Sequence, residues 1–271
     1  MFSNYFANQG MLHLLYKARN GGENMDKLKQ VIALKQELDQ CRPLPPEAVK
    51  NLREIYRVEW TYNSNAIEGN TLTILETKLV IEEGITIGGK QLREHFEVIN
   101  HKEAIEFVEE FVSKEELLTE IMLKQIHYLI LKNIDNKNAG VYRKVNVGIS
   151  GSEHQPPHFL ALEDEMRKLF CWYEVNKSLL HPVELAAIFH FKFVYIHPFA
   201  DGNGRTARLL LNLILMKHGY PPAIVKAAPN SRIKYYETLE LASVKNEVQP
   251  FIEVVATCVE ESLKRYLHVI K

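Results

Sequence analysis

The sequence has few cysteines, no long apolar run and no excess of charge of either sign. Its 271 residues include only three cysteines, Cys41, Cys171 and Cys258, which lie far apart in the chain. An odd number at such spacings is not typical of a disulfide framework or a zinc site, and it indicates reduced thiols. The longest apolar stretch, residues 209–216, is interrupted by Asn212 and is too short to span a bilayer. These absences exclude a small disulfide-rich protein and argue against a membrane partner.

The charge balance limits the partners that the chain can attract. Lysine and arginine number 33 and aspartate and glutamate 34, which leaves a formal charge of −1. Without a basic field over the molecule we expect no nucleic-acid partner, so any phosphate binding must be local. The N-terminus has no basic segment before an apolar run and therefore does not resemble a secretory signal. We expect a cytoplasmic protein.

Apolar residues recur at three- and four-residue spacings from about residue 26 onward, which predicts a single, nearly all-α domain over residues 26–271. Residues 1–25 lack this pattern and are interpreted as an N-terminal extension, either preceding a natural start at Met25 or forming an ordinary mobile terminus. Residues 145–157 read as a short hairpin or loop. The expected helices cover about residues 26–41, 47–66, a segment after Thr71 or Thr73, 91–112, 115–133, 161–177, 182–196, 204–218, 231–243 and 250–268.

One stretch, HPFADGNGRTAR at residues 197–208, gathers the groups that phosphate chemistry needs. Its glycines let backbone N–H groups approach an anion, and a following helix N-terminus adds partial positive charge. Arg205 and Arg208 are expected to project toward the same side of that helix. Asp201 offers a hard oxygen ligand for Mg²⁺, and His197 can take a proton near neutral pH. The set is typical of a site that transfers part of a polyphosphate.

Two other readings of this stretch are weaker. Gly202, Gly204 and Ala207 match a loose dinucleotide-binding fingerprint, but that fold needs an acidic residue about 20 positions on. No acidic residue lies between Asp201 and Glu237, and the chain shows no βαβ alternation. A plain helix–loop–helix with a capping residue would leave the histidine and both arginines without a role.

The stretch has the form His-x-Phe-x-Asp-Gly-Asn-Gly-Arg-x-x-Arg and resembles the signature of Fic-domain proteins, most of which transfer AMP from ATP to a hydroxyl of a target protein. Residues 62–267 also resemble the branch that includes the animal endoplasmic-reticulum Fic AMP-transferase, through HPVE at 181–184, GYPP at 219–222 and the tyrosine pair at 235–236. The membrane anchor of that animal protein has no counterpart in this sequence. The resemblance implies an all-α Fic-type helical bundle with a short β-hairpin flap near the active site and a Fic core at about residues 95–245.

The resemblance also implies residue roles. His197 would be the general base that deprotonates a Ser, Thr or Tyr hydroxyl of the target, and Asp201 would hold Mg²⁺ between the α- and β-phosphates. Asn203 and the backbone amides of residues 202–205 would hold the α- and β-phosphates, with pyrophosphate as the leaving group, and Arg208 would bind the γ-phosphate. The flap, residues 145–157, would place the target side chain by strand-like pairing; without the family it would read as a surface hairpin. Further contacts with ATP are expected from Val147, Gly148, Ile149, Ser150, Gly202, Gly204, Arg205, Thr206, Ala207, Tyr235, Tyr236 and Ser243.

A second motif lies upstream, at residues 64–69 with the sequence SNAIEG. By chemistry alone Glu68 is a carboxylate at a helix end. The motif resembles the [Ser/Thr]-x-x-x-Glu-[Gly/Asn] inhibitory motif, in which Ser64, Glu68 and Gly69 would end an inhibitory helix at about residues 47–69 and Glu68 would pair with Arg208. In some relatives the same carboxylate positions water to remove AMP.

Three functions stay open at this point: a self-inhibited AMP-transferase, an enzyme that mainly removes AMP by using Glu68, and a nucleotide-sensing interaction module. The expected partner is a target protein with an accessible hydroxyl, and the resemblance leaves a homodimer open. His154 and His158 lack carboxylate or cysteine partners at ligand spacing, so we do not expect a metal site there.

Overall fold

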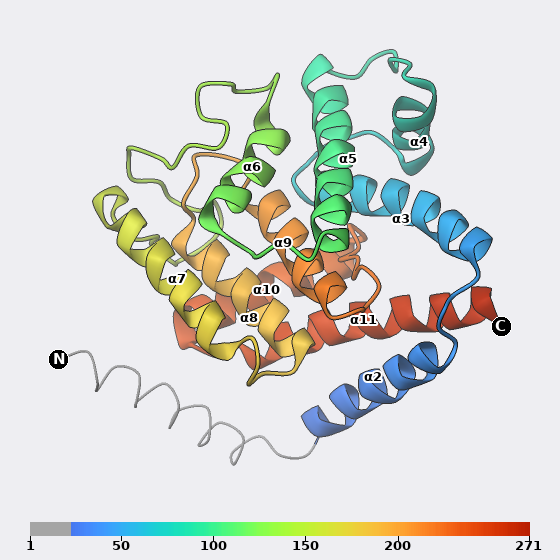
Figure 1. Ribbon diagram of the computed structural model, residues 1–271. Helices are drawn as coiled ribbons and strands as arrows, with labels where there is room; N and C mark the ends of the chain where they lie inside the picture. The colour runs from blue at the N-terminus through green and yellow to red at the C-terminus, as the bar shows by residue number, and fades with distance from the viewer. Residues whose placement is uncertain (1–22) are drawn as a thin grey trace.

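The computed structural model describes residues 23–271, which form helices joined by loops (Figure 1). Most of the expected extension, residues 1–25, lies outside the described residues. In chain order the elements are α2 (Glu23–Gln40), α3 (Pro46–Ile67), α4 (Ile74–Glu83), α5 (Leu92–Ser113), α6 (Glu120–Leu131), the 3-10 turn η1 (Phe159–Ala161), α7 (Leu162–Asn176), α8 (Pro182–Ile196), α9 (Asn203–Lys217), α10 (Pro229–Lys245) and α11 (Gln249–Ile270).

Capping residues explain where several helices begin. Proline is the first residue of α3 and of α8. Its lack of an N–H costs nothing there, because the first N–H groups of a helix have no acceptor within the helix. Thr73 caps α4 in a reciprocal arrangement with Glu76. The helix expected at residues 115–133 begins only at α6, because Glu115 has a left-handed φ of 55° and the Thr119 side chain accepts a bond from Met122 N–H.

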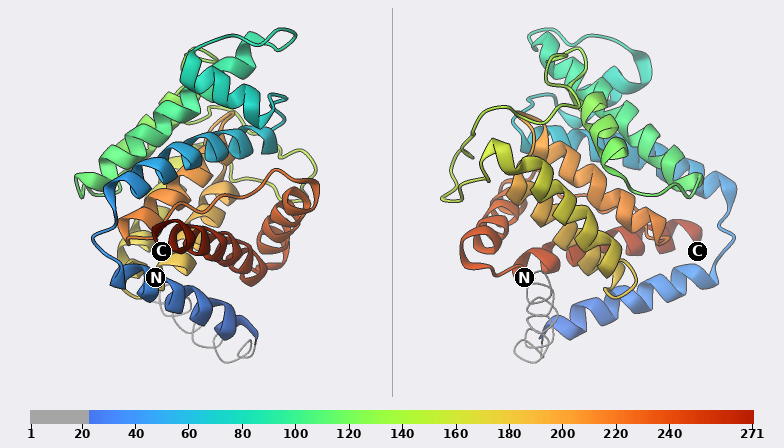
Figure 2. Two further views of the ribbon diagram at one scale, coloured as in Figure 1. Left: turned by 90° about the vertical axis from the view of Figure 1, so that its right-hand side faces the viewer. Right: turned by 60° about the vertical axis from the view of Figure 1, so that its left-hand side comes forward.

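The two helices that flank the signature lie at the centre of the bundle. α8 is strongly apolar, with Glu184 and Lys192 as its charged residues, and it packs along α9. α9 also contacts α3, α5 and α6, while α2 lies along α11 (Figures 1 and 2). The main core runs from Val31 on α2 to Leu267 on α11, and a smaller cluster of Leu72, Val80 and Val98 lies beneath α4. The signature turn is therefore held between two well-packed helices.

The expected β-hairpin is wrong: residues 145–157 contain no strand. They contain one tight turn, in which Ser152 N–H donates to the Ile149 carbonyl at 3.1 Å. Pro156 and Pro157 have no N–H to donate, so the returning arm cannot form a regular ladder. We call residues 145–157 the flap loop.

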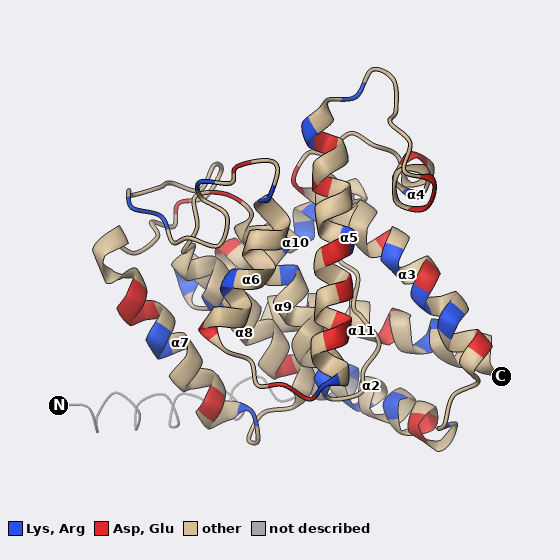
Figure 3. Cartoon of the chain, turned by 45° about the horizontal axis from the view of Figure 1, so that its top comes forward, with Lys and Arg blue, Asp and Glu red and all other residues tan. Residues whose placement is uncertain are grey.

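Acidic and basic residues are interspersed along α3 and α7, whereas α5 carries mainly acidic residues (Figure 3). Over the described part of the chain, no helix combines the length and apolarity needed to cross a membrane.

Candidate active site

The signature forms the turn from α8 into α9. His197 ends α8 with a left-handed φ of 50°, and its N–H donates to the Phe193 carbonyl at 3.0 Å. Gly202 precedes α9, which begins at Asn203. The Asn203 amide closes the turn, because its Nδ2 donates to the Phe199 carbonyl at 2.9 Å and its Oδ1 accepts from Phe199 N–H at 3.0 Å. The Asn203 side chain is thus bound within its own loop and shapes the turn, rather than standing free to hold phosphate.

His197 is largely buried, and burial lowers its pKa to about 4. The nearby Val194 carbonyl and the Glu68 carboxylate favour the protonated ring, whereas Arg143 and His154 disfavour it. No described residue meets the His197 Nδ1 at hydrogen-bond geometry. The imidazole is therefore neutral at physiological pH.

Asp201 carries its negative charge although it is partly buried. Burial raises its pKa, but Arg205, the Gly202 N–H and Arg93 together lower it below the ordinary value. Its Oδ2 accepts from Arg93 Nη2 at 2.7 Å, and its Oδ1 accepts from Gly202 N–H at 2.5 Å and from Arg205 Nη2 at 3.3 Å. Both carboxylate oxygens are engaged by cationic or N–H donors.

The first turn of α9 lies against the Glu68 carboxylate. The N–H groups that begin an α-helix have no acceptor within the helix and carry partial positive charge. Gly204 lies in this turn, and a Cβ placed on it would come within 2.3 Å of Glu68 Oε1. The Glu68 carboxylate thus lies against the start of α9 at a place that only glycine leaves open.

Arg208 joins α9 to the end of α3. It is 3% exposed. Nη2 donates to Glu68 Oε1 at 2.8 Å and to the Ser64 carbonyl at 2.7 Å, and Nε donates to Ser64 Oγ at 3.0 Å. Burial acts to lower the pKa of Arg208, but Tyr235 and Glu68 together raise it above its usual value. Gly69 then ends the helix segment with a φ of 98°, a conformation that side chains other than glycine rarely adopt.

The two signature arginines do not point to the same side, contrary to expectation. Arg208 faces α3, whereas Arg205 faces α5, where its Nη1 lies 3.4 Å from Glu97 Oε1. Thr206 and Ala207, which were expected to contact ATP, are fully buried. Their side chains belong to the packing of α9.

The α10 residues expected near the nucleotide divide into an inner and an outer group. Tyr235 is buried behind Arg208 and its hydroxyl lies 3.3 Å from Arg208 Nη1 and 3.1 Å from His190 Nε2. It therefore positions the guanidinium. Tyr236 is 41% exposed, and its hydroxyl donates to the Ile67 carbonyl at 3.2 Å. Ser243 donates to its own helix at the Leu239 carbonyl.

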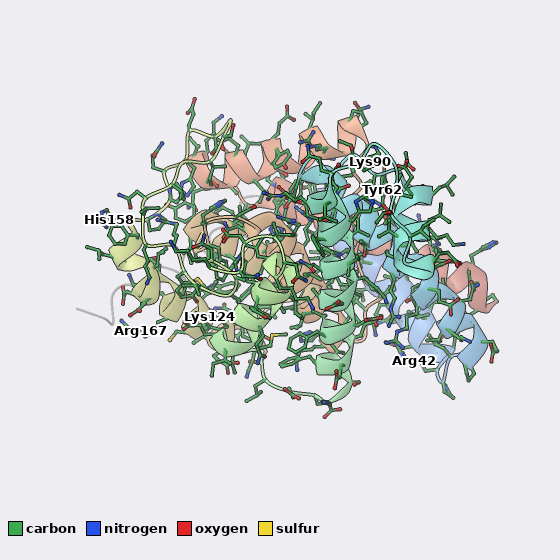
Figure 4. All side chains as sticks on the ribbon, turned by 90° about the horizontal axis from the view of Figure 1, so that it is seen from above. Arg42, Tyr62, Lys90, Lys124, His158 and Arg167 are labelled. Atoms are coloured by element: carbon green, nitrogen blue, oxygen red, sulfur yellow. The ribbon has the colours of Figure 1, made fainter. Side chains whose placement is uncertain are left out.

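The flap loop lies against α8 and α10. Its tip is held by Glu240, which accepts from Ser152 Oγ and, at 2.7 Å, from Glu153 N–H. His154 is buried and its Nε2 lies 2.8 Å from the Tyr195 carbonyl. His158 lies at the outer edge of the structure (Figure 4). Val147 and Ile149 are half-buried, while Gly148 and Ser150 are exposed.

His127 on α6 supports the signature turn and was not predicted from the sequence. Its ring stacks on Phe199 with centroids 3.5 Å apart and planes 3° from parallel. Nδ1 accepts from Gly140 N–H at 2.9 Å, which leaves Nε2 to donate to the Asp201 carbonyl at 2.9 Å. Burial lowers the pKa of His127 to about 4, so this neutral tautomer persists at pH 7.

Arg93, Glu97, Arg143 and His190 were also missed. They lie outside the signature in the sequence and follow no recognisable spacing, so nothing in the chain order indicates that they approach residues 197–208.

The chain is similar in sequence and in fold to known proteins. Residues 117–215 match the Fic/DOC family. Over 218 residues the chain is 41% identical to the protein adenylyltransferase Fic of Nematostella vectensis, covering 80% of this chain and 50% of that protein. The chain thus spans about half the length of the curated relatives it matches.

Two solved structures share the whole arrangement. A Fic domain containing signaling protein from Bacteroides thetaiotaomicron is 30% identical, with a TM-score of 0.81 over 89% of this chain and 97% of that one. Fic-1 from C. elegans is 32% identical, with a TM-score of 0.81 over 98% of this chain and 77% of that one. With its signature turn, its helical fold and two solved relatives at 30% and 32% identity that it matches over 97% and 77% of their length, the chain belongs to the Fic/DOC family.

Proposed function

We propose that the protein is a protein adenylyltransferase that transfers AMP from ATP to a Ser, Thr or Tyr hydroxyl of a target protein and releases pyrophosphate. The curated relatives named protein adenylyltransferase support the activity. The observation that carries the proposal is a neutral His197 on the same turn as the N-terminus of α9, whose first N–H groups have no acceptor within the helix. A base and an anion-binding helix end are thereby placed together.

His197 would act as the general base. Because its pKa is about 4, it is unprotonated at neutral pH and can accept the target hydroxyl proton. The hydroxyl oxygen then forms a bond to the α-phosphorus of ATP. The bond from that phosphorus to the oxygen bridging to the β-phosphate breaks, and pyrophosphate leaves with the electron pair.

The backbone amides at the start of α9 would face the α- and β-phosphates, and Arg208 would bind the γ-phosphate. Planar guanidinium groups suit phosphate oxygens, and helix N-termini stabilise negative charge. The exposed ring of Tyr236 is the better placed of the two tyrosines to pack against the adenine, and Ser243 and residues 147–150 are proposed to border the nucleotide.

The residues present fit Mg²⁺ as a cofactor. Mg²⁺ in nucleotide sites is held by one or two carboxylates together with substrate phosphates and water. Asp201 supplies an ionised carboxylate on the signature turn. Within the described residues, no group of three or more His, Cys, Asp or Glu side chains is positioned to hold a metal, so the substrate phosphates and water would have to complete the shell. Bound there, Mg²⁺ would neutralise charge that develops on the phosphates.

We further propose that the α3 segment ending at Gly69 is the inhibitory helix. The Glu68 carboxylate lies against Gly204 and accepts a hydrogen bond from Arg208. It therefore occupies the anion position at the start of α9 and engages the arginine that would bind the γ-phosphate. One guanidinium group cannot bond the carboxylate and a phosphate with the same donors. ATP would therefore bind in an unproductive position until Glu68 moves away.

A second candidate function, removal of AMP from a modified protein, is favoured by the nearness of Glu68 to the catalytic turn. The Glu68 charge acts on His197, so a water molecule between them could be oriented toward the phosphate of AMP. The nucleotide-sensing alternative would require the same residues to bind ATP without turnover.

The proposed partner is a target protein with an accessible hydroxyl. A homodimer is also proposed, which size-exclusion chromatography with light scattering would test. A cytoplasmic location is proposed because Cys41, Cys171 and Cys258 are unpaired.

The deciding experiment is to incubate host-cell lysate with α-labelled ATP and the Glu68→Gly variant. A labelled protein band that is absent with the Glu68→Gly, His197→Ala double variant is the expected result. No labelling at any ATP concentration would refute transfer, and release of AMP from a pre-modified protein by the wild type would favour the second function.

A further inference from the structure

Arg143 is a buried cation without a counter-ion. Arg143 is only 4% exposed, and burial lowers the pKa of its guanidinium group. Among residues 23–271 no carboxylate pairs with it. Arginine is almost never fully buried unless it is paired, so its donors must be satisfied in another way.

Backbone carbonyls, instead of a carboxylate, accept the hydrogen bonds of the Arg143 guanidinium. Nε donates to the His197 carbonyl at 2.9 Å, Nη1 to the Val145 carbonyl at 2.9 Å and Nη2 to the Pro157 carbonyl at 2.6 Å. The N–H of Arg143 itself donates to the Pro198 carbonyl at 2.9 Å. One side chain therefore joins the turn after α8 to both ends of the flap loop.

The His197 turn needs such support. A left-handed conformation is uncommon outside glycine and persists only where the surroundings hold it. In this conformation the His197 carbonyl has left the helix and points to a donor outside it. The Arg143 guanidinium supplies that donor while it also fixes the loop.

We propose, building on the adenylyltransferase function, that Arg143 is a positioning residue that holds the base of the flap loop at a fixed distance from His197. A target hydroxyl carried by the loop then arrives in register with the imidazole. Three carbonyls in different directions require the planar fork of arginine, because a lysine ammonium is a single point charge. Charge alone therefore does not replace it.

The test compares Arg143→Lys with the parent, both in the Glu68→Gly background. The acceptor is the protein recovered from the lysate labelling. We expect kcat/KM for the acceptor to fall roughly ten- to a hundredfold, corresponding to the loss of one or two charge-assisted bonds. Affinity for a fluorescent ATP analogue should stay unchanged. Hydrogen exchange of the amides in residues 145–157 should become faster.

Arg57→Lys is the matched control, because Arg57 is also partly buried but pairs with Glu106 and Glu109, which a lysine can still contact. It should leave acceptor kinetics and loop exchange unchanged. Glu240→Gln loosens the loop tip without touching the catalytic turn, so it should raise KM for the acceptor while kcat is preserved.

Circular dichroism and thermal melting establish that each variant folds. A folded Arg143→Lys variant with parental loop exchange and parental kcat/KM for the acceptor would overturn the proposal. If Arg143→Lys does not fold, unchanged acceptor KM in Glu240→Gln would count against docking of the loop as the determinant of target position. Loop exchange is measured without ATP, so it decides the anchoring role even if AMP transfer itself were refuted.

Discussion

Replacing Glu68 by glycine should raise the rate of AMP transfer at subsaturating ATP roughly ten- to a hundredfold. The change removes the carboxylate that lies against Gly204 and bonds to Arg208 at 2.8 Å. Arg208 keeps its bonds to Ser64 and Tyr235, so the guanidinium stays in place and becomes free toward solvent and phosphate. Glu68 follows the last residue of α3, where glycine costs little helix stability.

The magnitude follows from the strength and exposure of this contact. A hydrogen bond to a charged group contributes about 1.5–3 kcal/mol. The Glu68 side chain is 35% exposed and that of Arg208 is 4%, so solvent screens the carboxylate in part and lowers this contribution slightly. A bias of about 1.4–2.8 kcal/mol corresponds to roughly ten- to a hundredfold in productive binding.

The assay is α-labelled ATP incorporation measured over a range of ATP concentrations. Glu59→Gln is the matched control: Glu59 lies on the same helix, is 30% exposed and also pairs with an arginine, Arg265, but on the outer face. It should leave the rate unchanged. Combining Glu68→Gly with Arg208→Ala should lose most of the gain, because the released arginine no longer exists.

Equal rates for the wild type and Glu68→Gly at every ATP concentration would refute the self-inhibition argument. Glu68 would then be an ordinary carboxylate at a helix end. An increase of similar size in Glu59→Gln would instead point to a general loosening of α3 rather than to the contact with Arg208.

The other predictions concern the base, the metal and acid stability. His197→Ala should lower transfer about 10²–10⁴-fold while binding of a fluorescent ATP analogue persists, and a near-parental rate would contradict its role as base. Asp201→Ala should abolish both activity and the response to Mg²⁺ titration; an unchanged Mg²⁺ response would mean that it only shapes the turn. Arg93→Gln should tighten Mg²⁺ binding a few-fold at low salt, measured by calorimetry, and the difference should vanish at high salt because the Arg93–Asp201 pair is exposed. His127 has its pKa lowered from 6.5 to about 4, so the unfolded chain binds more protons between these values and stability should fall as the pH drops through that window. His127→Gln should flatten that part of the stability curve, read by urea unfolding at pH 7 and pH 4.5, and an identical slope would contradict the buried neutral ring.

The helices were largely predictable because their apolar spacing is local. The segments expected at 182–196 and 204–218 correspond closely to α8 and α9. The flap loop was not: the residues alone left a hairpin or a loop open and the resemblance implied a hairpin, whereas a pair of prolines and the donors of Arg143 decided its course. Asn203 was expected to face phosphate, yet the tight turn brings its amide back onto Phe199.

Residues 197–208 by themselves determined that a histidine, a carboxylate and the start of a helix lie together, because neighbours along a short turn stay close in any fold. Which side chains complete the site was decided by the tertiary structure. Glu68 and Arg208 are 140 residues apart, and Arg93 and Asp201 are 108 apart. Only the packing of α3 and α5 against α9 brings each pair into contact. Burial then sets the chemistry of His197 and Arg143. Exclusion of water lowers the pKa of both side chains, and residue order alone does not specify which side chains are buried.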